Sequence, residues 1–394
     1  MSVNLYAASN QWASRPDDER FGTVDELLAF TRAERDASIQ SAPLPFNTLR
    51  AVADEGAVSI EGSTGKRAAL THFAFSQVSA IAHAPAEFLR QLPAGLAVDV
   101  LNDRLANTAR TTEKHDLRIL FRQNGSLLTR AITSDVYDRV WNADVVEQAV
   151  VPLTSEGFRV PPARPCRAGQ KGTRTATEAD ILPGQGDFGL SVKVGDEIAP
   201  AGLYASDRDM FAFLVDPRRG VDIGGRRTMR GVFLRNSEVG DGSLIFDWFD
   251  LDSVCGNHIV WGATNRNQVR VRHVGSNTLD RALARYEVEA KRFDDASSER
   301  EALVTAARKY TIAASKEEVI KAVVKFAKTR SLPLSGKAIE AAADTAEART
   351  DRYGAPNTAW AVSSGLTENS QALPNMSDRH AVDVAAGKVL AMAF

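Results

Sequence analysis

The sequence has little cysteine, no long apolar run and almost no net charge. Among its 394 residues are two cysteines, Cys166 and Cys255, which are too few for a disulfide framework. No apolar run approaches the roughly 18 residues that a membrane-spanning helix needs. The opening segment MSVNLYAASNQWASRPDDER lacks the apolar core of a signal peptide. A formal net charge of -2 gives no overall field that would attract nucleic acid. We therefore expect a cytoplasmic protein with no membrane partner, in which any polyanion would bind to local patches.

Several catalytic signatures are also missing. The sequence contains neither H-E-x-x-H nor G-x-S-x-G. The segment Gly184–Gly189, GQGDFG, has the spacing of a dinucleotide-binding loop, but the following LSVKV predicts a strand where that loop needs a helix. Lys66 and Lys337 each follow a glycine, yet no hydroxyl residue comes after them as in a phosphate-binding loop. We therefore expect no cofactor, and the sequence does not favour an enzyme.

The sequence does contain an ordered succession of helices, mixed strands and helices. Capping boxes of the form Ser/Thr-x-x-Glu predict helix starts at Thr23 and Ser315, and Asn124-Gly125 between two apolar runs predicts a β-hairpin turn. Because strands and helices do not alternate, we predict an α+β fold with a central mixed or antiparallel sheet with β-hairpins, flanked by N-terminal and C-terminal helices. The predicted regions are a mainly helical 1–115, a sheet-containing 116–275 with a flexible linker at about 159–186, and a helical 276–394.

Five carboxylates lie in the strand-like segment RNSEVGDGSLIFDWFDLDSVCGNHIVWG, residues 235–262. Oxygen ligands of this kind suit a divalent cation, and the five are Glu238, Asp241, Asp247, Asp250 and Asp252. Cys255-x-x-His258 has the spacing of half a zinc site, but no second close pair completes it. We favour the simpler interpretation of a turn at Asp241-Gly242, solvent-facing aspartates and a packed cysteine. We expect no metal site, and the weak candidates are Asp247, Asp250, Asp252 and His258.

Positive charge is concentrated locally, mostly as arginine. Arginine pairs two phosphate oxygens through its planar fork, and aromatic side chains beside a basic groove can stack bases. The predicted nucleic-acid contacts are Arg218, Arg219, Arg226, Arg227, Arg230, Arg266, Arg270 and Arg272. The aromatic residues considered with them are Tyr137, Trp141, Phe246, Trp248 and Trp261. The alternative is that the arginines form solvated hairpin tips and the aromatic residues belong to the core.

Segments along most of the chain resemble the phage/plasmid-like proteins grouped as domain of unknown function 932. The matching stretches are LTHFAFSQVSAIAHAPAEFLRQLP, LRILFRQNGSLLTRAITSDVYDRVWNADVVE, FLRNSEVGDGSLIFDWFDLDSVCGN and NTAWAVSSGLTE, within about residues 45–370. The family usually reads Cys-Thr-Asn-Gly where this chain has Cys255-Gly256-Asn257-His258. The resemblance implies a protein of a mobile element in a bacterial host cell, with NSEVGDG marking a hairpin conformation, and it implies no particular reaction.

These features favour a DNA-binding protein of a mobile element. The specific expectation is single-strand binding or annealing in replication or recombination, with DNA, including single-stranded DNA, as the partner. Two alternatives stay open: a protein-interaction factor, such as a host-defence antagonist or an assembly component, and a metal-dependent nuclease. A homo-oligomer is also compatible with the sequence.

Overall fold

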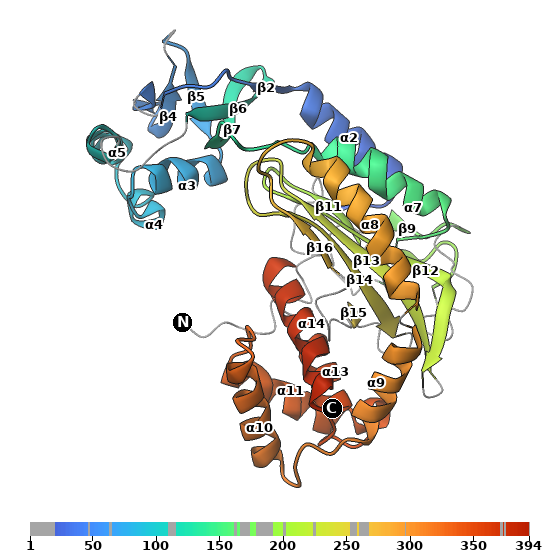
Figure 1. Ribbon diagram of the computed structural model, residues 1–394. Helices are drawn as coiled ribbons and strands as arrows, with labels where there is room; N and C mark the ends of the chain where they lie inside the picture. The colour runs from blue at the N-terminus through green and yellow to red at the C-terminus, as the bar shows by residue number, and fades with distance from the viewer. Residues whose placement is uncertain are drawn as a thin grey trace.

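In the computed structural model the chain folds into two large β-sheets with helices packed on them (Figure 1). The structure describes residues 20–45, 48–62, 65–108, 116–160, 164–165, 174–178, 192–199, 202–223, 226–252, 258–259, 268–295, 297–370, 373 and 376–393. The α+β fold predicted from the sequence is confirmed. No helix in this described part of the chain is both long and apolar enough to cross a membrane.

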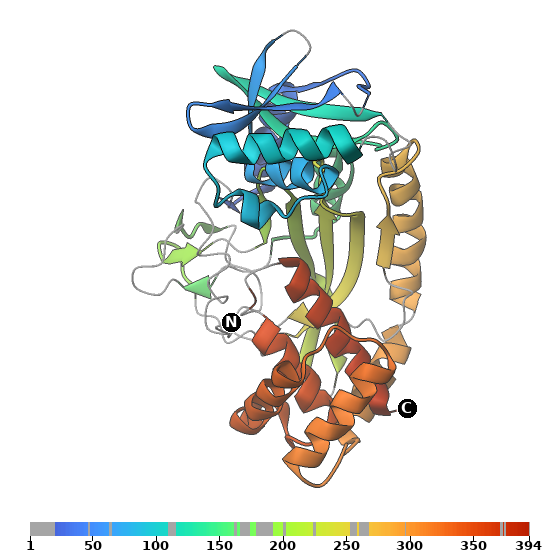
Figure 2. The ribbon, with the colours of Figure 1, turned by 90° about the vertical axis from the view of Figure 1, so that its left-hand side faces the viewer.

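The six-stranded sheet comes from the N-terminal part of the chain. Its strands, in spatial order, are β2 (Ser38–Gln40), β6 (Leu117–Asn124), β7 (Ser126–Ser134), β5 (Arg67–Leu70), β4 (Ala57–Glu61) and β3 (Arg50–Asp54). All neighbouring pairs are antiparallel except β5 and β7. The helices α3 (His72–Ile81), α4 (Ala86–Leu89) and α5 (Ala94–Thr108) lie on one face of this sheet (Figure 2). Val78 and Leu101 pack there in one buried cluster with Ile60 and Ile132.

Local sequence signals placed some of these elements correctly and missed others. The predicted hairpin is confirmed, because the Asn124-Gly125 turn joins β6 to β7 and Gly125 has a φ of 73°. Both predicted capping boxes form, at Thr23 and at Ser315. The strands β2 to β5, by contrast, lie inside the region expected to be mainly helical. Each is only 3 to 5 residues long, which is too short for a clear alternation of apolar and polar residues.

The seven-stranded sheet forms the centre of the molecule and is antiparallel throughout. In spatial order it contains β1 (Arg20–Phe21), β11 (Leu203–Ala205), β12 (Met210–Ile223), β13 (Arg226–Asn236), β14 (Leu244–Asp252) and β15 (His258–Ile259), and β16 (Gln268–Val271) also pairs with β14. A small separate sheet contains β8 (Arg164–Pro165), β10 (Glu197–Ala199) and β9 (Arg174–Thr175).

One face of the seven-stranded sheet is covered by helices from both ends of the chain. They are α2 (Val24–Asp36), the continuous segment of α6 (Asn142–Val145), a π-helix (Val146–Val150) and α7 (Val151–Ser155), and α8 (Thr278–Asp295). Trp248 and Phe246 are buried under these helices, and the Trp248 ring centre lies 5.0 Å from that of Tyr286 in α8. These two candidate stacking residues are therefore part of the core.

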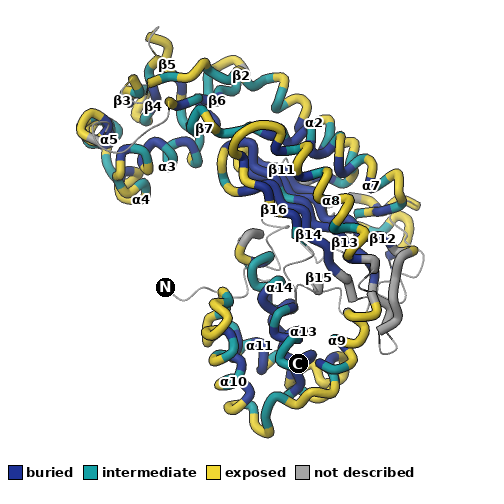
Figure 3. Tube along the Cα trace, viewed as in Figure 1, coloured by how far each residue is buried: buried dark blue, intermediate teal, exposed yellow. Residues whose placement is uncertain are grey.

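The C-terminal helices pack beside the sheet and reach its other face. They are α9 (Ser297–Lys309), α10 (Lys316–Thr329), α11 (Gly336–Ala348), α12 (Thr350–Tyr353), α13 (Ala359–Ser370), α14 (Met376–Leu390) and a 3₁₀ turn (Ala391–Ala393). Val384 of α14 packs against the buried cluster on the second sheet face, which includes Phe233 and Ile245. Figure 3 shows the strands of this sheet buried and exposed residues along α10.

Some expectations fall where the structure gives no description. The predicted linker at about 159–186 lies mostly outside the described residues. The GQGDFG segment and the two cysteines, Cys166 and Cys255, lie outside them entirely.

Candidate functional site

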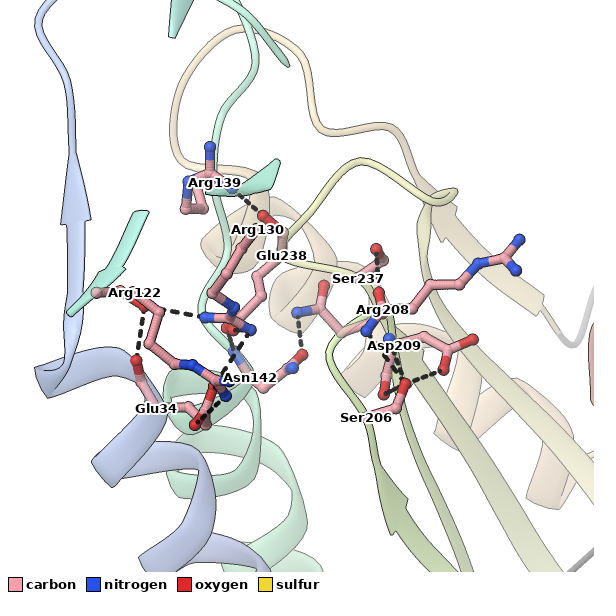
Figure 4. A network of polar contacts seen from close by, with 12 residues as sticks. Glu34, Arg122, Arg130, Arg139, Asn142, Ser206, Arg208, Asp209, Ser237 and Glu238 are labelled. Carbon is pink, nitrogen blue, oxygen red and sulfur yellow. Dashed lines mark hydrogen bonds and ion pairs between the residues drawn. The ribbon is translucent and has the colours of Figure 1, made fainter. Parts of the chain in front are cut away.

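The segment Asn236–Val239, which begins at the last residue of β13 and leads toward β14, is buried although three of its four residues are polar. The Asn236 side-chain amide donates to Oδ1 of Asn142 at 2.8 Å. The Glu238 carboxylate accepts hydrogen bonds from the Arg130 guanidinium at 2.6 Å and from the Asn142 backbone nitrogen at 3.0 Å. Since Arg130 belongs to β7, these bonds join the two large sheets (Figure 4). We call this set of contacts the buried junction.

Residues just after β7 complete the buried junction. The Tyr137 hydroxyl donates to the carbonyl oxygen of Ser237 at 2.7 Å, and the Arg139 guanidinium donates to that of Glu238. Burial raises the pKa of Tyr137 well above its usual range and lowers the pKa of Arg139 to about 10. Two of the segments that carry the family resemblance therefore meet here. Because these groups are shielded from solvent, we assign the junction to holding the sheets together and not to binding a ligand.

The predicted arginine hairpin is confirmed, because β12 and β13 pair antiparallel as far as Ile223 and Arg226. Arg218 is exposed, and its Nε lies 3.1 Å from Oδ1 of Asp216, beside a register shift in the β12–β13 ladder. The backbones of Arg219, Arg226 and Arg227 belong to these two strands, whereas their side chains lie outside what the structure describes. The hairpin thus places four of the predicted arginines near one end of the sheet.

The other predicted arginines are separated by the fold. Arg230 is buried, with its guanidinium 4.5 Å from the centre of the Trp248 ring. Arg270 is exposed on β16 and Arg272 is exposed directly after it, whereas Arg266 lies outside the described residues. Arg230 therefore belongs to the packed contact between the sheet and α8, and a phosphate cannot reach it in this structure.

The acidic residues of the same segment have separate roles. Asp247 is buried and accepts a hydrogen bond from Gln268 Nε2 at 2.9 Å, and its Oδ2 lies 3.0 Å from His380 Nε2. Asp241 pairs with Arg208 at 2.6 Å. The side chains of the remaining weak metal candidates, Asp250, Asp252 and His258, lie outside the described set. Among the residues that the structure does describe, no three His, Cys, Asp or Glu side chains form a group that could hold a metal ion.

A cleft of about 280 Å³ opens between the second face of the seven-stranded sheet and α14. Its lining includes Phe233, Gln268 and Arg270 from the strands, Leu332 from the α10–α11 connection, and His380 and Lys388 from α14. We call this cavity the basic cleft. It brings together residues more than a hundred positions apart in the sequence, and it contains one of the arginines predicted to contact nucleic acid.

The imidazole in the basic cleft is held in place from two sides. The His380 ring centre lies 4.6 Å from that of Phe233, and Nε2 is occupied by the Asp247 carboxylate. Gln268 donates to the same carboxylate oxygen. One buried aspartate therefore orients two polar side chains that line the cleft.

The charge of the basic cleft is positive. Arg270 is exposed and its Nε donates to the Ser243 hydroxyl at 3.3 Å, and Lys388 is half-buried in α14. Within the described part of the chain, neither cation has a carboxylate within 4.0 Å, and no carboxylate lines the cleft. A third lining residue, Arg235, is already compensated by Asp241 at 3.3 Å. Arg270 and Lys388 are thus the cations that remain for an anionic ligand.

A cationic helix face continues from the cleft and was missed in the sequence. Lys321, Lys325 and Lys328 recur on α10 at helical spacing and are exposed, as is Arg330. The helix leads directly into Ser331–Pro333, which line the cleft. No acidic residue occurs between Glu318 and Glu340. This run without acidic residues was the available signal, but its basic residues are mostly lysines and begin on a helix, whereas the predicted nucleic-acid contacts are arginines on hairpins.

Comparison with known proteins identifies the family of this region. Residues 190–382 match the family model described as domain of unknown function (DUF932). The match includes most of the seven-stranded sheet, α10 and the residues of the basic cleft as far as Ala381, whereas Lys388 and the resembling segments before residue 190 lie outside it. No curated protein and no solved structure matches the chain. The family description names no activity, and the phage or plasmid origin stays a prediction. Residues 190–382 therefore carry a domain of unknown function 932.

Proposed function

We propose that this protein binds nucleic acid, with single-stranded DNA as the preferred form, at the basic cleft and along the cationic face of α10. The observation that supports this most is the pair Arg270 and Lys388 in a cleft whose described lining carries no carboxylate. Uncompensated cations attract phosphates, and a guanidinium can pair two phosphate oxygens at once. The whole chain has a net charge of only -2, so a polyanion is expected to bind at this local concentration of positive charge.

The size of the cleft favours a single strand over a duplex. Its volume of about 280 Å³ is at the lower end of ligand pockets. A duplex keeps its bases stacked and paired, so it cannot insert one of them between the sheet and α14 without paying for unstacking. A single strand presents bases that are already accessible, and its backbone can follow the exposed lysines of α10. Replication, recombination or annealing of the DNA of a mobile element is the process in which we place this binding.

The test is fluorescence anisotropy of labelled single-stranded and duplex DNA between about 50 and 200 mM salt. Replacing Lys321, Lys325 and Lys328 together by glutamine should weaken binding and reduce the slope of log affinity against log salt by about 2, or about 0.7 for each lost contact. The control is Lys291→Gln, an exposed lysine of α8, the helix that covers the opposite face of the sheet from the cleft. Salt-independent binding, or equal affinities for the triple variant and the control, would count against the proposal.

The hairpin arginines can be tested in the same assay. If Arg226 and Arg227 contact phosphates as the sequence suggests, their joint replacement by glutamine should also lower the affinity and the salt slope. An unchanged slope would restrict the binding surface to the cleft and α10.

A further inference from the structure

We infer that the basic cleft holds a single nucleotide unit, with its phosphate at Arg270 and Lys388 and its ring beside His380. This inference rests on the proposed function, since a nucleotide is the repeating unit of the polymer that the surface is proposed to bind. The inference goes beyond charge recognition along α10, because the cleft would also recognise the ring and the phosphate of one nucleotide.

The size of the cavity limits the ligand to one unit. A volume of about 280 Å³ lies just below the usual range of about 300–1,000 Å³ for small-molecule pockets. One ring with its phosphate is therefore the largest part of a strand that we expect inside, while neighbouring nucleotides stay outside. The exposed cations of α10, which lead into the rim at Ser331–Pro333, are placed to meet those neighbours.

The polar atoms in the cleft are complementary to a nucleotide. Arg270 and Lys388 donate hydrogen bonds and carry the positive charge that a phosphate requires. The Gln268 amide nitrogen is directed to Asp247 at 2.9 Å, and no described group bonds its amide oxygen, which can accept from a base amino group or a sugar hydroxyl. His380 uses Nε2 toward the same Asp247, so Nδ1 is the ring nitrogen that can meet the ligand.

The remaining walls suit the flat, apolar part of the ligand. The His380 ring lies against Phe233 with 30° between the ring planes, which supports the imidazole from behind as a small stacking surface. Val384 and Leu332 add aliphatic surface to the same cavity. An apolar pocket with a few fixed polar groups is the general pattern of a small-ligand site. Asp247 pre-orients two of those polar groups, which reduces the entropic cost of binding.

The experiment is isothermal titration calorimetry of the full chain with deoxyadenosine 5′-monophosphate, deoxyadenosine and inorganic phosphate. The monophosphate should bind with one site per chain and more tightly than either of its parts. Arg270→Gln and Lys388→Gln should each weaken it about tenfold, because each removes a charge-assisted hydrogen bond. Ala381→Phe should abolish binding with the charges unchanged, since Ala381 lines the cleft. Lys291→Gln is the control, and circular dichroism melting checks that every variant is folded.

Parallel anisotropy with single-stranded DNA separates this inference from the proposed function. DNA binding by a wild-type chain that does not bind the monophosphate would overturn the inference and leave the proposed function standing. No binding of either ligand would overturn both. Monophosphate binding that is lost in Ala381→Phe and kept in the α10 triple lysine variant supports the inference. If the monophosphate displaces a short oligonucleotide, the cleft holds one nucleotide of the bound strand. If the monophosphate binds without displacing the oligonucleotide, the ligand of the cleft is a free nucleotide, which overturns the assignment to a strand.

Discussion

At the scale of single residues, Glu238 joins the two sheets through both its carboxylate and its backbone carbonyl oxygen. Its carboxylate is buried and lies 2.6 Å from the guanidinium of Arg130, which is itself only 1% exposed. Removing the Glu238 carboxylate leaves the buried Arg130 charge with only the more distant carboxylate of Glu34, at 3.8 Å, in a medium that solvates the charge poorly. Removing one member of the pair is therefore expected to cost more folding stability than replacing both members with apolar residues.

We predict that Glu238→Ala lowers the free energy of unfolding by about 3 to 5 kcal/mol. Urea unfolding followed by circular dichroism measures this change, and Glu340→Ala, at an exposed position on α11, is the control. The double variant with Arg130→Met should recover part of the loss, because no buried charge is then left alone. Equal stabilities of Glu238→Ala and the control would show that the ion pair is not essential.

Gly365 on α13 lies so close to the backbone of α11 that a larger side chain does not fit at this position. A Cβ atom at this position would lie 2.3 Å from the carbonyl oxygen of Ala342 on α11. The two helices can approach this closely only because the side chain is a hydrogen atom.

We predict that Gly365→Ala destabilises the protein by about 1 to 3 kcal/mol, since backbone atoms must move to remove the clash. The same substitution at Gly336, the first residue of α11, meets no atom within 4 Å and should be neutral or slightly stabilising. Thermal unfolding of both variants gives the comparison. A Gly365→Ala variant as stable as Gly336→Ala would contradict the close helix contact.

At the scale of elements, α14 holds a buried carboxylate behind the basic cleft. Asp383 is buried, accepts a hydrogen bond from the Ser370 hydroxyl of α13, and its Oδ2 lies 3.8 Å from Arg379 Nε. Burial outweighs these favourable partners and raises the pKa of Asp383 to about 6.

The folded protein therefore holds the Asp383 proton more strongly than the unfolded chain does. Between a pKa of 3.8 and one of about 6, stability present at low pH is lost as the pH rises, by up to about 3 kcal/mol. We predict that the difference in unfolding free energy between wild type and Asp383→Asn changes in this direction from pH 4 to pH 6. Asp378→Asn, an exposed position on the same helix, should show no such change. A constant difference across that range would exclude the raised pKa.

Elements that depend on a few adjacent residues could be predicted from the sequence, whereas elements that depend on distant pairing could not. Capping boxes and the Asn124-Gly125 turn are local signals, decided by a few adjacent residues, and they formed as expected. The short strands β2 and β5 depend on pairing with β6 and β7 much later in the chain, which no local pattern contains. The basic cleft depends on Arg270 and His380 meeting across the fold. Arg270 could be nominated by its charge, but the burial of Arg230 and the pairing of Asp247 with His380 could not be foreseen.

At the scale of the whole molecule, the family segment 190–382 does not contain all of the apolar residues that cover its sheet. One face of its sheet is covered by apolar residues from earlier in the chain, including Leu27, Val146 and Phe158, in the same cluster as Trp248. The segment alone would keep α8 on this face but would expose to water the part that the earlier residues cover.

We predict that a fragment of residues 190–382 self-associates and binds a hydrophobic dye, whereas the full chain does not, because large exposed apolar surfaces drive association. Size-exclusion chromatography with light scattering and dye fluorescence compare the two under the same conditions. A monomeric fragment with cooperative unfolding and no dye binding would show that the N-terminal part is dispensable for folding.

The buried junction also constrains how such a chain can diverge over evolution. The Asn236 side-chain amide, the Ser237 carbonyl oxygen, and the carboxylate and carbonyl oxygens of Glu238 are bound by residues at positions 130 to 142, all of which precede the family segment. A substitution on either side alone leaves a buried group without its partner, so we expect the two sides to change together or to stay fixed. A relative that shares only the family segment must supply another cation for the residue equivalent to Glu238, or have lost that carboxylate.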